Sequence, residues 1–186
     1  MGLKNTKETY GWLTQVLHWS WVIGSLTAFG SMYYRQYFLP EKHPTGSFLM
    51  GSVHKPVGVV VLIIACFAFA WHLFNRKPDL PQAMPNWEKI FAVFVHRCLY
   101  LFLMIMPLTG LLMSTASGRS VDVFGLFNTP LFFEENKELG SLLWQVHGII
   151  SYFGLTLIAL HLGGLIKQHF RGDSVWYKML PFLRRT

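Results

Sequence analysis

The sequence predicts an all-α integral membrane protein built as a four-helix bundle. Apolar residues make up 52% of the 186 residues, and charged residues only 13%. A helix needs about 20 mostly apolar residues to cross a bilayer, and four segments meet this requirement: 11–33, 51–74, 90–115 and 142–166. We therefore expect a single domain, residues 1–186, in which four transmembrane helices pack together.

The first segment follows Lys4 and Lys7, as the apolar core of a signal peptide would. It is longer than such a core and lacks a clear small-residue cleavage site, so we interpret it as a retained helix. The connections 35–50 and 75–87 contain two and three prolines respectively, and we expect loops without regular structure there. The longer connection, 116–140, contains the apolar stretch 121–127, which predicts a short element at the membrane interface.

Basic residues are distributed unevenly between the two predicted faces. Eleven lie on the side of the termini and the second connection, and five on the other side, namely Arg35, Lys42, Lys55, Arg119 and Lys137. Cytoplasmic loops carry the excess of Lys and Arg, so both termini are expected in the cytoplasm. This topology accounts for most of the net charge of +7, and no nucleic-acid partner is expected.

Histidines occur in the predicted spans at matched depths. His147 and His161 are fourteen residues apart in the fourth segment, which is roughly 21 Å and nearly four helical turns, so both side chains project from one face. His18 lies near the inner depth of His161, and His54 near the outer depth of His147. Haem iron of a low-spin electron carrier takes two axial ligands. Two pairs of histidines therefore predict two haems, one near each membrane face.

Several alternatives remain at the level of single residues. His96, in the third segment, lies at the inner depth and competes with His18 for the same iron. An intramembrane histidine can also serve only as a hydrogen-bonding group between helices. His72, at the inner end of the second segment, is expected to meet a haem propionate or lipid headgroups, whereas His43 and His169 are expected in solvent.

The remaining chemistry-bearing residues suggest little else. Cys66 and Cys98 lie in apolar segments and outside any C-x-x-C-H motif, which predicts b-type, non-covalent haem and inert thiols. Neither a zinc pattern nor a nucleophile elbow occurs, so catalytic residues are not assigned.

The motifs around these histidines resemble those of the bacterial cytochrome b561 family. They are YGWLTQVLHW at residues 10–19, HKPVG at 54–58, PLTGL at 107–111, and the WQVH and ALH stretches that end at His147 and His161. The resemblance implies a four-helix protein of the bacterial inner membrane with two haems b. It assigns His18 and His161 to the inner haem, His54 and His147 to the outer haem, and no axial role to His96. An arginine expected at the inner end of the second helix is absent, since Ala70, Trp71 and His72 stand there.

Family members are quinone-linked electron carriers, and some pass an electron from superoxide to ubiquinone. The resemblance therefore implies superoxide:ubiquinone oxidoreductase activity, with lipid, quinone, and superoxide or another small reductant as partners. Arg35 and Lys55, and also Arg119, lie on the outer side, where they could attract superoxide or pair with propionates or lipid phosphates. The alternative function is a membrane cytochrome b subunit that relays electrons between quinol and a separate redox protein. A transporter or scaffold without cofactor would fit four helices but not the paired histidines.

Overall fold

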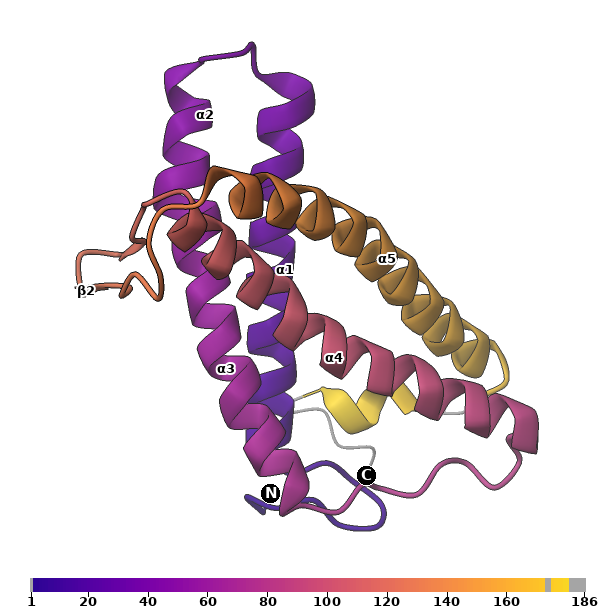
Figure 1. Cartoon of the computed structure of the whole chain (residues 1–186). Helices are drawn as coiled ribbons and strands as arrows, with labels where there is room; N and C mark the ends of the chain where they lie inside the picture. The colour runs from indigo at the N-terminus through magenta and orange to yellow at the C-terminus, as the bar shows by residue number, and fades with distance from the viewer. Residues whose placement is uncertain (1, 173–174, 181–186) are drawn as a thin grey trace.

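The computed structural model describes residues 2–172 and 175–180, which fold mostly as helices (Figure 1). The four long helices are α1 (Trp12–Phe38), α3 (Lys55–Leu73), α4 (Asn86–Ala116) and α5 (Lys137–Phe170). The shorter elements are α2 (Pro44–Phe48), the π-helix η1 (Leu49–His54), the 3-10 helix η2 (Val175–Met179), and strands β1 (Asp122–Val123) and β2 (Phe127–Asn128). Arg184 and Arg185, counted above among the inner basic residues, lie outside the described ranges.

Within the described ranges, three helical stretches are long and apolar enough to cross a membrane: Pro44–Leu73, Asn86–Ala116 and Lys137–Phe170. This agrees with three of the four predicted spans. Helix α1 has 27 residues, which is sufficient length, but polar residues such as Thr14 and Gln15 make it less apolar than the others. Its only Lys, Arg, Asp or Glu residue is Arg35, in the last turn.

The long helices pack against one another in sequence order. Helix α1 lies against α3, α3 lies against α4, and α4 makes the largest interface with α5. In Figure 1, α1 and α3 stand side by side, while α4 and α5 form a second pair that leans away from them toward the lower right. Between the two pairs, Trp21 of α1 packs with Val61 and Ala65 of α3, and Tyr100 of α4 covers this cluster.

The predicted loop at 35–50 is wrong, because α1 continues to Phe38 and a helix restarts at Pro44. Proline is well suited to the first helical position, where its missing N–H would have no partner anyway. The side chain of His43 accepts a hydrogen bond from the Thr45 N–H at 3.3 Å and so caps this helix. Helices α1, α4 and α5 also run beyond the predicted apolar segments at one or both ends, since a helix can extend past the hydrocarbon layer, whereas α3 lies within its segment.

The apolar stretch 121–127 forms a β-hairpin, in which Asp122 pairs with Asn128 and Val123 with Phe127. Its turn places Phe124 and Gly125 at positive φ, and the Asp122 carboxylate accepts a hydrogen bond from the Gly125 N–H at 3.0 Å. Val121 and Val123 are buried against Val59 of α3. The short element predicted in this connection is therefore a hairpin, and it packs on α3.

The two terminal segments meet at the opposite end. The Gln15 side-chain amide donates to the Lys178 carbonyl at 2.9 Å, and the Trp19 indole donates to the Met179 carbonyl at 2.7 Å. The Asn5 side chain accepts from the Gly11 N–H at 2.8 Å. The start of α1 and the segment that follows α5 are thus on one side of the molecule.

Helices α4 and α5 are joined at this same end by charged groups. The Glu88 carboxylate, on a residue only 8% exposed, accepts hydrogen bonds from Lys167 at 3.0 Å and from Arg171 at 2.7 Å. The side chain of Gln168 also donates to it, at 3.3 Å. The Lys167 ammonium lies 5.0 Å from the centroid of the Trp87 ring. One carboxylate therefore holds the last turns of α5 to the first turn of α4.

Close contact at the middle of the α4–α5 interface depends on Gly154, because a Cβ atom added there would overlap the ring of Phe102. We expect Gly154→Ala to lower the free energy of unfolding by about 1–3 kcal/mol, the usual cost of overpacking. Gly163→Ala, on the same helix, is the matched control, since an added Cβ meets no atom within 4 Å. The free energy of unfolding of both variants is measured by denaturation in mixed micelles. Equal stability of the two variants would contradict the close contact.

Candidate haem-binding sites

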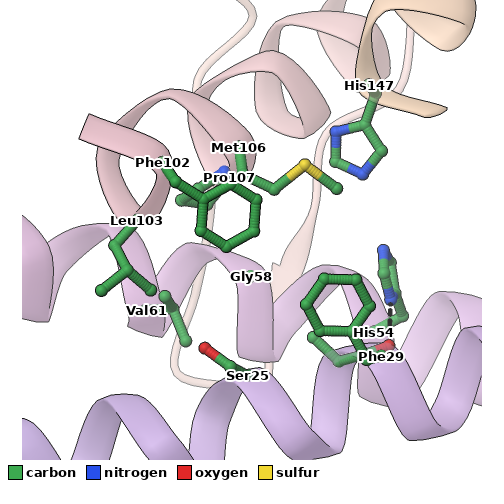
Figure 2. Close-up of a pocket in the computed structure, with 11 residues that line it drawn as sticks. Ser25, Phe29, His54, Gly58, Val61, Phe102, Leu103, Met106, Pro107 and His147 are labelled. Atoms are coloured by element: carbon green, nitrogen blue, oxygen red, sulfur yellow. Dashed lines mark hydrogen bonds between the residues drawn. The ribbon is translucent and has the colours of Figure 1, made fainter. Parts of the chain in front are cut away.

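Two histidines face each other at the hairpin end of the bundle. His54 ends η1 and His147 projects from α5, and their ring centroids are 6.3 Å apart with an interplanar angle of 81°. Figure 2 shows the two imidazoles on opposite sides of one cavity. The Nδ1 atom of His54 lies 2.9 Å from the Ala28 carbonyl oxygen. A carbonyl can only accept, so Nδ1 carries the proton and Nε2 keeps a free lone pair.

His147 is oriented in the same way by a side chain. Its Nδ1 atom lies 2.9 Å from the Thr109 hydroxyl, which is also 2.7 Å from the Met106 carbonyl oxygen. The hydroxyl donates its proton to this carbonyl, so it can only accept from Nδ1–H of His147. Both imidazoles at this end thus present an unprotonated Nε2, the form that binds a metal.

Three histidines meet at the opposite end. The ring centroids of His18 and His161 are 6.5 Å apart with an interplanar angle of 54°, and those of His96 and His161 are 5.0 Å apart at 87°. The sequence-based expectation that these three share one depth is therefore consistent with the structure. His96 Nδ1 lies 2.6 Å from the Ala92 carbonyl of its own helix. Within the described residues, the buried Nδ1 atom of His18 has no hydrogen-bond partner.

These spacings can be compared with the requirement of an iron that has two axial imidazoles. Metal–imidazole bonds of about 2 Å on either side of one ion hold the ring centroids about 6 Å apart. The His54–His147 and His18–His161 pairs meet this requirement. The His96–His161 pair is closer than it allows.

The space between the outer imidazoles is lined by apolar side chains. The cavity there has a volume of about 60 Å³, and Phe29, Phe102, Leu103, Met106 and Pro107 form much of its wall (Figure 2). Gly58 also lines it, and a Cβ atom added at Gly58 would meet no atom within 4 Å. The donor set and the apolar wall suit a haem b. The ring itself is larger than the cavity, so its binding requires side chains such as Phe102 and Leu103 to move outward.

The outer basic residues fall into two places. The Lys55 ammonium donates to the Ser114 hydroxyl at 3.2 Å, and Lys55 and Arg119 both line a second cavity of about 410 Å³ together with Asp122. This cavity lies beside the hairpin, and Lys55, which lines it, directly follows His54 in the sequence. Arg35 packs over Gly46 of α2 and does not line either cavity. The structure therefore brings Lys55 together with Arg119, and not with Arg35.

The remaining candidate residues are His72 and the two cysteines. The ring of His72 stacks on Tyr100, with centroids 5.0 Å apart and planes at 25°. Cys66 is exposed and Cys98 partly exposed, and neither forms a disulfide. The sequence did not reveal Thr109 and the Ala28 carbonyl as the hydrogen-bond partners of His147 and His54, although Thr109 lies within the PLTGL motif.

Comparison with known proteins identifies the family of this chain. Residues 9–182 match the family described as prokaryotic cytochrome b561. The chain belongs to this family. It is accordingly a membrane b-type cytochrome that acts in electron transfer, as its long apolar helices also indicate.

Three curated relatives cover nearly the whole chain. Cytochrome b561 homolog 1 of Escherichia coli (strain K12) is 27% identical over 173 residues, which are 90% of this chain and 95% of that protein. Cytochrome b561 homolog 2 of the same organism is 24% identical over 172 residues, covering 91% and 89%. A protein of Yersinia pestis named "Probable superoxide oxidase CybB" is 23% identical over 176 residues, covering 94% and 97%.

Proposed function

We propose that this cytochrome b561 family member holds two haems b and oxidises superoxide with ubiquinone as electron acceptor. The observation that supports it best is the presence of two histidine pairs, one at each end of the bundle, with ring centroids 6.3 and 6.5 Å apart. Haem b bound between such pairs supplies a one-electron carrier near each membrane face. Residues 1–186 then form a single electron-transfer domain.

The axial ligands are His54 and His147 for the outer haem and His18 and His161 for the inner haem. Ring spacing favours His18 over His96, since His96 is only 5.0 Å from His161. His96 then borders the inner site without binding its iron. The free Nε2 atoms of His54 and His147 agree with a ligand role for both.

We propose further that α1 is a fourth span, which makes a four-helix transmembrane bundle. It lies against α3, a candidate span, and its only charged residue is Arg35 in the last turn. Four spans return the chain to its starting side, in agreement with the bonds from Gln15 and Trp19 to the segment after α5. The excess of basic residues at that end favours a cytoplasmic location for both termini, with the protein in the bacterial inner membrane.

The reaction balances with two superoxide ions for each quinone. Each superoxide loses one electron and becomes dioxygen, and ubiquinone takes up two electrons and two protons to become ubiquinol. Superoxide is an anion, and Lys55 and Arg119 supply positive charge at the second cavity, beside the hairpin. They can therefore raise the local concentration of superoxide there. Arg35, farther along the outer face, adds to the same field. The name of the Yersinia pestis relative is in line with this activity.

The topology predicts that reporters fused after Thr186 and inserted between residues 128 and 136 lie on opposite sides of the membrane. A reporter that is active only in the cytoplasm should be active when it is fused after Thr186, because an even number of spans places both termini on the cytoplasmic side. Activity of the same reporter at both positions would overturn this topology, because α5, the one long helix between them, would then not cross the membrane.

The ligand assignment predicts two haems per chain by pyridine haemochrome analysis. Replacement of His54 or His147 by alanine should remove one haem and leave the other, because the remaining pair lies at the far end of the bundle. Replacement of His18 or His161 should remove the other haem. His96→Ala is the matched control and should retain both. Loss of a haem in His96→Ala, with retention in His18→Ala, would show that the inner ligand is His96.

The substrate assignment predicts that superoxide reduces the oxidised protein at a rate that falls several-fold as salt rises. Exposed charges are screened over a Debye length of about 10 Å at 0.1 M ionic strength. The double variant Lys55→Gln/Arg119→Gln should lower the rate and flatten its salt dependence more than Arg35→Gln does. The variant Lys4→Gln/Lys7→Gln removes two charges at the other end and should leave the dependence intact.

Stopped-flow mixing measures this rate, with haem content checked in each variant. A rate independent of salt in the unmodified protein would exclude steering. Failure to turn over superoxide with a soluble quinone, combined with rapid reduction by quinol, would favour the relay subunit of a larger oxidoreductase.

A further inference from the structure

The two histidine pairs differ in the groups that contact their Nδ1 atoms. At the outer pair, His54 donates to a backbone carbonyl and His147 donates to the Thr109 hydroxyl, each at 2.9 Å. At the inner pair, the Nδ1 atom of His18 is buried and has no partner among the described residues. A side chain that accepts from a ligand's Nδ1 is therefore found at the outer pair.

The Thr109 hydroxyl is held in place by its surroundings. Thr109 is only 8% exposed, and its hydroxyl donates to the Met106 carbonyl at 2.7 Å. The neighbouring Gly110 lets the imidazole of His147 lie directly against α4, because a Cβ atom at Gly110 would be 3.1 Å from the His147 Cε1 atom. Because the hydroxyl donates its own proton to the Met106 carbonyl, it can present a lone pair to Nδ1–H of His147.

A hydrogen bond of this kind changes the metal-binding properties of an imidazole. An acceptor at Nδ1–H fixes the tautomer and the ring orientation, and it makes the opposite nitrogen a stronger donor to the metal. A stronger axial donor stabilises the oxidised iron relative to the reduced iron, so the reduction potential falls. The same acceptor also prevents the ring from turning its Nδ1 toward the iron.

We propose that Thr109 is a positioning residue that orients His147 and lowers the reduction potential of the haem held by His54 and His147. This inference rests on the proposed assignment of those two histidines as the outer axial ligands. A lower potential at the outer side favours delivery of electrons from that side inward. Thr109 thus acts on the direction of transfer through His147, without contact with substrate.

The test is a spectroelectrochemical redox titration of the purified holoprotein and of three variants. Thr109→Val keeps the shape of the side chain and removes the acceptor. We expect the equilibrium constant for reduction of the outer haem to increase about tenfold, which corresponds to a rise of about 59 mV in its one-electron reduction potential. Thr109→Ser restores a hydroxyl and should restore the potential. Thr115→Val is the matched control, because Thr115 is a fully buried threonine on the same helix whose hydroxyl has no hydrogen-bond partner in the part of the chain that the structure describes.

Repetition of the titration in a His18→Ala background, in which the outer haem alone is expected, assigns the shift to that haem. A rise in Thr109→Val that is absent in Thr109→Ser and Thr115→Val supports the proposal. An unchanged outer potential in a Thr109→Val protein that retains two haems overturns it and leaves the proposed function intact. A haem count of fewer than two in the unmodified protein contradicts the proposed function itself.

Discussion

The bundle is organised around imidazoles placed in an apolar interior. A polar side chain within a membrane is costly unless another group satisfies it, and here the partners come from different helices. His54 reaches the Ala28 carbonyl of α1, and His147 reaches the Thr109 hydroxyl of α4. Each bond fixes both the ring and the distance between two helices. The same contacts that satisfy the imidazoles therefore align α1, α4 and α5 around a shared space.

The arrangement of the helices follows from this need for space between the pairs. Among the described residues, α1 and α5 are not packed closely against each other, although His18 on one and His161 on the other face across the bundle. The α4–α5 pair compensates with tight contacts of its own. Gly154 admits the Phe102 ring at the middle of the interface, and Glu88 bonds to two cations of α5 at its end. The α4–α5 interface is therefore the dense part of the structure, whereas the cavity between His54 and His147 is lined by residues of several helices.

Helix content and the depths of the histidines could be predicted from the sequence, because the rise of an α-helix is constant and fourteen residues always make nearly four turns. The rotation of neighbouring helices against one another could not be predicted from the sequence. The partnership of Thr109 with His147 depends on how α4 is rotated against α5, which side-chain packing determines. The proximity of Lys55 to Arg119 likewise depends on the hairpin between α4 and α5. That hairpin was not predicted because its strands have only two residues each, too few for a periodic pattern to show.

The bonds of Gln15 and Trp19 to Lys178 and Met179 have a consequence for biogenesis. They join residues 163 and 160 positions apart, so they can form only after nearly the whole chain has left the ribosome. Contacts between such distant residues carry a large loop-closure cost and form late. The contacts of Gln15 and Trp19 with the segment after α5 are therefore absent until synthesis is nearly complete. Of the two ends of the molecule, the one at which the terminal segments meet is the last to close.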